Sequence, residues 1–147
     1  MLSIDTNILL PAVDAGNQSH AAAAAFLQSI HGRDDVVISE FILLELYVLL
    51  RNPAVVASPL SAATAARVCE AFRSHPRWQL AGFPPDSRPV HDELWPRLRA
   101  KDFARRRVYD LRSALCLLRN GVTEFATVNI KDFQGIGFAR VWNPLSI

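Results

Sequence analysis

The chain has 147 residues and a net charge of +2, and 50% of its residues are hydrophobic. This length suits one domain with its own core, and this composition excludes an intrinsically disordered chain. Apolar runs stay well short of the roughly 20 residues that cross a bilayer, and the amino terminus lacks the pattern of a signal peptide. We therefore expect a single cytoplasmic domain over residues 1–147, with no membrane association.

Short apolar strands alternate with longer helices along the chain. The first strand, residues 1–4, is expected to end at Asp5, with Thr6 or Asn7 capping a helix that begins at Ile8. The other predicted strands span 36–38, 78–83, 124–128 and 139–142. The other predicted helices span 20–30, 40–51, 61–74, 90–100 and 110–120. This alternation predicts an α/β fold with a central parallel β-sheet flanked by helices on both faces.

The charges are divided unevenly between the two halves. Residues 1–72 carry 3 basic and 7 acidic side chains, and residues 73–147 carry 13 and 7. Nearly all the basic residues are arginine, which binds phosphate through two parallel hydrogen bonds. An acidic half beside an arginine-rich half fits a metal site next to a nucleic-acid track, although an uneven solvated surface would give the same totals.

Three carboxylates are candidate active-site groups. Asp5 follows a strand, at the sheet edge where α/β proteins gather function, although it could instead be a turn residue. Glu45 lies in a helix that is apolar on every face, so we expect a buried helix whose lone carboxylate needs a cation. The alternatives for Glu45 are a gap to solvent or a distant arginine. Asp110 opens a helix, where it could equally serve as an N-cap.

Convergence of these acids would favour a bound cation. Two like charges about 4 Å apart repel by about 4 kcal/mol at an effective dielectric constant of 20. A divalent cation removes this conflict, and oxygen ligands without a His or Cys cluster indicate Mg²⁺, for which Mn²⁺ can substitute. Thr127, Asn129 and Asp132 follow a later apolar strand and can face the same edge.

The motifs, taken in order, resemble those of PIN-domain ribonucleases. Residues 4–7 (Ile-Asp-Thr-Asn) resemble the first motif, Ser39 followed by Glu45 the second, and Asp110 with Ala114 the third. Residues 127–133 and 141–145 are similar to the tail of the VapC toxins. The resemblance implies a PIN-like fold and a Mg²⁺-dependent endoribonuclease, in which a metal-activated water hydrolyses RNA. It also implies the toxin of a VapBC-type toxin–antitoxin module, with a VapB-like antitoxin as partner and a homodimeric assembly.

The resemblance also implies roles for individual residues. Asp5, Glu45 and Asp110 are expected to hold the metal. Asn129 stands where many PIN domains have Asp, so Asn129, or Asp132 acting through water, is expected to complete the site. The residues expected to bind substrate are Thr6, Asn7, Arg105, Arg106, Arg107 and Arg112. For Thr6 and Asn7, orientation of Asp5 is an alternative, and for Arg112, contact with the antitoxin.

Other functions remain as hypotheses. Because Asn129 brings no charge, a non-catalytic RNA-binding module with a degenerate PIN fold is the principal alternative. A phosphoacceptor domain would need an early acidic pair, whereas Asp5 stands alone. A phosphatase of the haloacid dehalogenase type would need a second aspartate at the position of Asn7.

Overall fold

A parallel five-stranded sheet forms the centre of the computed structural model, which describes residues 1–146. The strands are β1 (Leu2–Ile4), β2 (Val36–Ser39), β3 (Gln79–Ala81), β4 (Glu124–Ala126) and β5 (Arg140–Trp142). Their order across the sheet is β3-β2-β1-β4-β5, and every neighbouring pair is parallel. The predicted parallel sheet is therefore confirmed, with β1 in the middle.

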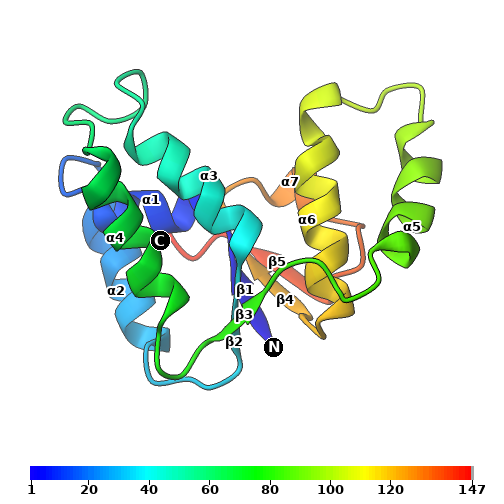
Figure 1. The fold of residues 1–147 in the computed structure, drawn as a ribbon, viewed down its shortest axis with the longest axis horizontal. Coiled ribbons are helices and arrows are strands. Elements are labelled where there is room, and N and C mark those ends of the chain that lie inside the picture. Colours follow the sequence, from blue (N-terminus) through cyan, green and yellow to red (C-terminus); the bar gives the residue numbers. More distant parts are fainter. Residues whose placement is uncertain (147) are drawn as a thin grey trace.

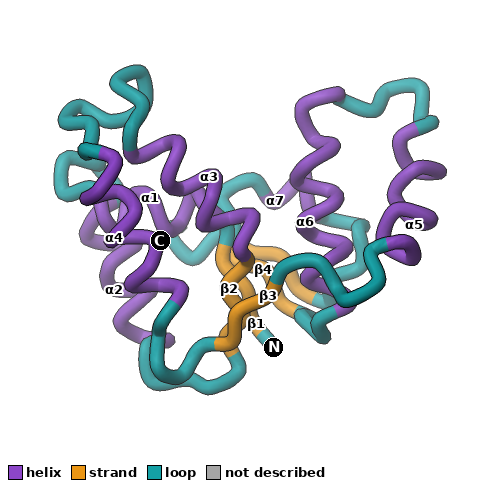
Figure 2. The backbone as a smooth tube through the Cα atoms, in the orientation of Figure 1, coloured by secondary structure: helices purple, strands orange, loops and turns teal. Residues whose placement is uncertain are grey.

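Helices lie on both sides of this sheet. The helices are α1 (Thr6–Val13), α2 (His20–Ile30), α3 (Glu40–Leu50), α4 (Ala62–Arg73), α5 (Arg88–Leu98), α6 (Val108–Arg119) and α7 (Ile130–Phe133). A 3₁₀ turn, Arg105–Arg107, leads into α6. Helices α1 to α4 stand on one side of the sheet and α5 and α6 on the other (Figure 1). Figure 2 shows the strands gathered between these two groups. Within residues 1–146, every helix is too short or too polar to cross a membrane.

Strands β1 and β2 are buried along their whole length, and β4 is buried except at Glu124. Leu2, Ile4 and Phe125 are essentially inaccessible to solvent, and so are the valines of β2. Strands covered on both faces need apolar side chains on both faces, which explains their continuous apolar runs. Apart from the buried Ser3 within β1, the polar residues of this region lie at the strand ends, where Asp5 and Thr127 directly follow β1 and β4.

Three helices begin earlier than predicted, and α5 does so at Arg88, two residues before its predicted start. Helix α1 starts at Thr6 because the carboxylate of Asp5 accepts the Thr6 N–H and acts as the N-cap, so Thr6 and Asn7 are helical residues instead of caps. Helix α6 starts at Val108, which places Asp110 in the first helical turn and not at the cap. The short helix α7 was not predicted, because four residues carry too little periodicity to reveal a helix.

The prediction that α3 is largely buried is wrong. Leu46 and Leu50 are buried, but Leu44 is 65% exposed and Glu45 is also exposed. One face of α3 packs against α1 and α4, while the opposite face borders an open cavity. The all-apolar sequence of α3 therefore serves one face that packs in the core and one face that borders the cavity. Glu45 lies on the cavity face, so it does not incur the free-energy cost of burial that was expected for it.

The two faces of α3 should respond differently to truncation. Leu46→Ala removes a buried side chain and should lower the free energy of unfolding by about 2–5 kcal/mol. Leu44→Ala, a matched change two residues away, should alter it by less than about 0.5 kcal/mol, as exposed sites do. Urea denaturation followed by circular dichroism measures both. Equal losses for the two variants would contradict this orientation of α3.

Candidate active site

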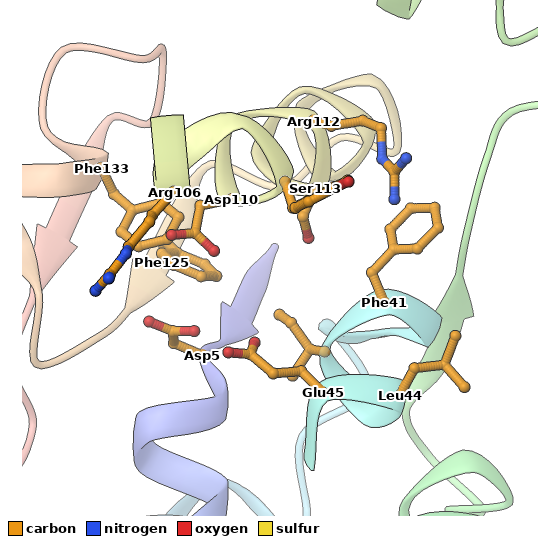
Figure 3. A pocket seen from close by; sticks show the side chains of 12 residues that line it. Asp5, Phe41, Leu44, Glu45, Arg106, Asp110, Arg112, Ser113, Phe125 and Phe133 are labelled. Atoms are coloured by element: carbon orange, nitrogen blue, oxygen red, sulfur yellow. The ribbon is translucent and has the colours of Figure 1, made fainter. Parts of the chain in front are cut away.

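A cavity of about 350 Å³ lies at the carboxyl end of β1, between α3 and α6. Asp5, Glu45 and Asp110 all line it, and their side chains point toward one another from three different elements (Figure 3). Asp5 follows β1, whereas Glu45 and Asp110 come from α3 and α6. The predicted convergence of the three carboxylates is therefore observed.

Asp5 is the most constrained of the three carboxylates. Its side chain is only 9% exposed, with Oδ1 accepting the Thr6 N–H at 2.8 Å and Oδ2 accepting the Thr127 hydroxyl at 2.6 Å. The pKa of Asp5 is raised to about 7, chiefly by burial, with the charges of Glu45 and Asp110 acting in the same direction and the two hydrogen bonds in the opposite one. At a pH near 7 the Asp5 carboxyl group is therefore about half protonated.

Glu45 and Asp110 complete the acidic wall of the cavity. The Thr6 hydroxyl donates a hydrogen bond to Glu45 Oε2 at 2.6 Å, which links the start of α1 to α3. Asp110 is half-buried, and desolvation raises its pKa to about 6, with the charges of Glu45 and Asp132 adding to this effect. Within residues 1–146, none of the three carboxylates has a basic side chain within 4.0 Å. Their negative charge is therefore not balanced by a direct ion pair.

Thr127 holds the site together from the end of β4. Its hydroxyl donates to Asp5, and the same oxygen accepts hydrogen bonds from the Asn7 side chain at 3.1 Å and from the Asn129 N–H at 3.0 Å. The Asn7 carboxamide also accepts the Val128 N–H at 3.0 Å. Thr127 was expected only to face this edge. Its contact with Asp5 spans 122 positions and leaves no local signal in the sequence.

The arginines predicted to bind substrate take three different positions. Arg106 and Arg112 line the cavity, whereas Arg105 is exposed on the 3₁₀ turn and is not part of the lining. Arg107 binds the Asp132 backbone carbonyl and lies 3.6 Å from its carboxylate. Thr6 and Asn7 direct their side chains at protein groups, as described above. The assignment of all six residues to substrate stays a prediction.

Asn129 and Asp132, one of which is expected to complete the site beside the three carboxylates, lie outside the cavity lining. Asn129 is exposed at the start of α7, and its backbone N–H, not its side chain, contacts the Thr127 hydroxyl. Asp132 pairs with Arg107, and its charge still raises the pKa of Asp110. Neither residue lines the cavity. Which of them acts in the site, as a metal ligand or otherwise, stays a prediction.

The acidic groups surround the cavity without touching. Across residues 1–146, no three His, Cys, Asp or Glu side chains form a ready-made metal cluster. The donors facing the cavity are carboxylate oxygens, the type that Mg²⁺ and Mn²⁺ prefer. Asp5 accepts two hydrogen bonds and Glu45 accepts one, and both Glu45 and Asp110 are less buried than Asp5.

A curated relative decides the family of this chain. Ribonuclease VapC24 of Mycobacterium tuberculosis is 50% identical over 146 residues, which is 99% of this chain and 98% of the relative; strains H37Rv and CDC 1551 both carry it. The chain belongs to the VapC family. No protein-family model matches it.

Solved structures of VapC-type proteins share the fold. Mycobacterium tuberculosis VapC20, described as a toxin that cleaves the sarcin–ricin loop, superimposes with a TM-score of 0.67 at 19% identity and covers 94% of this chain and 96% of its own. VapBC2 of Rickettsia felis gives 0.65 at 18% identity, covering 97% of each chain. FitAcB of Neisseria gonorrhoeae gives 0.66 at 18% identity, covering 100% of each. These likenesses confirm the predicted VapC-like, PIN-type fold.

The raised pKa of Asp5 predicts a pH-dependent stability. The folded chain keeps the Asp5 carboxyl group protonated up to about pH 7, because its pKa is raised to about 7 from the ordinary aspartate value of 3.8. The stability that this raised pKa contributes is therefore complete below about pH 4. It is lost as the pH rises through about 7, by on the order of 4 kcal/mol.

Urea denaturation in EDTA across this range measures the loss, and Asp5→Asn serves as the comparison. The variant should overtake the wild-type chain in stability as the pH increases. Parallel stability curves for the two chains would contradict the assignment of a raised pKa to Asp5.

Proposed function

We propose that the chain is a Mg²⁺-dependent endoribonuclease and the toxin of a VapBC-type module. The observation that carries the proposal is the convergence of Asp5, Glu45 and Asp110 on one cavity, with no basic side chain paired to any of them among residues 1–146. Membership of the VapC family supports RNA as the substrate, because the 50% identical relative is named a ribonuclease.

The three carboxylates suit a divalent cation. Asp5 offers a pre-positioned oxygen, and Glu45 and Asp110 can turn inward to meet a cation that they do not contact on their own. Mg²⁺ or Mn²⁺ held there would lower the pKa of a water molecule and stabilise charge on the phosphate under attack. Ionised Asp5 and Asp110 would then be stabilised by the cation, which reverses the rise in both pKa values.

The remaining groups position the reactants around this centre. The Thr127 hydroxyl keeps Asp5 in one orientation, and the Thr6 hydroxyl does the same for Glu45. Arg106 and Arg112 line the same cavity and can bind phosphate oxygens, which places an anionic RNA backbone beside the acidic groups. We assign Asn129 or Asp132 to the fourth position around the metal, through a water molecule.

The proposed partner is a VapB-like antitoxin. The Rickettsia felis neighbour was solved as VapBC2 bound to a DNA fragment from its promoter, and this chain matches it over almost its full length. We propose the same type of complex here, in the cytoplasm, with the toxin as a homodimer. The RNA named for VapC20 is not assigned to this chain, since 19% identity supports only the fold.

Asp5→Asn tests the catalytic assignment. The variant should lose RNA cleavage by roughly a hundredfold or more, because a metal site contributes several kcal/mol to charge stabilisation. It should also fail to arrest growth when expressed, while its circular dichroism spectrum and thermal unfolding remain those of a folded protein. Cleavage of purified cellular RNA in Mg²⁺ or Mn²⁺ is the measurement. Asp34→Asn, an exposed aspartate before β2, is the matched control and should cleave normally.

The degenerate-fold alternative makes the opposite prediction. A non-catalytic RNA-binding module would retain RNA in EDTA and would show no cleavage with Mn²⁺. That pair of results, or unchanged toxicity of Asp5→Asn, would overturn the proposed function.

A further inference from the structure

Three aromatic rings surround the Arg112 guanidinium at one end of the cavity. Arg112 Cζ lies 5.1 Å from the centroid of Phe41, 5.2 Å from Phe83 and 5.3 Å from Tyr109. The rings come from α3, from the segment between β3 and α5, and from α6. We call these four residues the Arg112 cluster. Cation–π contacts of this kind hold a guanidinium in place without neutralising its charge.

The guanidinium of the Arg112 cluster has no anionic partner in the protein. Across residues 1–146, no carboxylate lies within 4.0 Å of it, and its buried Nε–H has no acceptor. Leaving a buried donor unpaired costs about 1–3 kcal/mol. The protein therefore maintains a positioned, uncompensated cation beside a site that is expected to receive an anionic substrate.

Two of the three rings of the cluster are open to solvent. Tyr109 is 68% exposed and Phe83 is 46% exposed, although both pack on Arg112. Phe83 also contacts Phe41 edge-on at 4.8 Å, and Pro84, which follows Phe83, restricts its backbone. Exposed aromatic surface held in a fixed arrangement contributes little to folding, and it is typical of a surface that binds a planar ligand.

The cluster is continuous with the acidic groups. Tyr109 directly precedes Asp110 on α6, and Phe41 lies one turn before Glu45 on α3. In Figure 3, Phe41 and Arg112 stand at the opposite end of the cavity from Asp5 and Asp110, with Glu45 between the two ends. A strand of RNA whose phosphate meets the carboxylates would therefore carry a neighbouring nucleotide to the Arg112 cluster.

We propose that the Arg112 cluster is a nucleotide subsite in which an unpaired base next to the scissile phosphate stacks on Tyr109, while Arg112 donates to that nucleotide. The proposal rests on the proposed ribonuclease function and deepens it by naming single-stranded RNA as the form that binds. Single-stranded RNA is bound in this way, through unstacked bases on aromatic rings and arginine planes. A base covers exposed ring faces, which a phosphate alone cannot do, and the uncompensated cation favours a nucleic acid.

The test compares RNA with and without bases. Asp5→Asn serves as the background so that the probe stays intact, and the probes are a short fluorescent adenine oligoribonucleotide and an abasic strand of equal length. Tyr109→Ala should weaken binding of the adenine strand by about tenfold and leave binding of the abasic strand unchanged, as loss of one stacked base predicts. Tyr109→Trp should retain binding, because it retains a ring.

Trp95→Ala is the matched control, since Trp95 is an exposed aromatic residue of α5 outside the cavity lining. It should bind both probes as the background chain does, and thermal unfolding should confirm that every variant is folded. Equal losses of Tyr109→Ala on both probes, or no loss on either, would overturn the subsite, and so would a background chain that binds neither probe. A subsite confirmed in a wild-type chain that cuts no RNA would instead contradict the proposed function alone.

Discussion

The burial of the Asp5 carboxylate without a positive partner is the constraint around which this site is arranged. Two hydrogen bonds, from the Thr6 N–H and the Thr127 hydroxyl, compensate only part of the cost of removing that charge from water. The pKa of Asp5 therefore rises to about 7. Glu45 and Asp110 add to the same electrostatic conflict from α3 and α6. The folded protein therefore favours a partly protonated acidic cavity, and a cation that balanced its charge would stabilise it in the same sense.

The order of the strands makes this arrangement possible. Because β1 is central and β4 is its parallel neighbour, the residues that follow the two strands, Asp5 and Thr127, meet at one edge of the sheet. Asn7 ties the first turn of α1 to the same threonine and to the Val128 N–H. The most buried carboxylate is thus anchored at the end of the central strand, and the two less buried carboxylates project from helices across the cavity.

The layered fold and the place of Asp5 could be predicted because strand burial and strand ends leave direct marks in the sequence. The exposure of Glu45 could not be predicted, because an all-apolar helix has the same sequence pattern whether its second face meets a core or an open cavity. The alternative in which Asp110 is an N-cap does not hold, because α6 begins at Val108 and helix starts depend on local backbone geometry. Thr127 gained its role only in three dimensions, since its partner Asp5 lies 122 positions away. The Arg112 cluster also forms only in three dimensions, since Phe41 and Phe83 come from distant segments of the chain.

The most direct measurement of the central claim is the position of a bound metal. Crystals of the wild-type chain soaked in Mn²⁺ and measured at the manganese absorption edge would locate the ion by its anomalous signal. The account predicts a peak inside the cavity, with oxygen atoms of Asp5, Glu45 and Asp110 within about 2.0–2.3 Å directly or through one water molecule. A cavity without a peak at Mn²⁺ concentrations that support RNA cleavage, or a peak held by other residues, would contradict it.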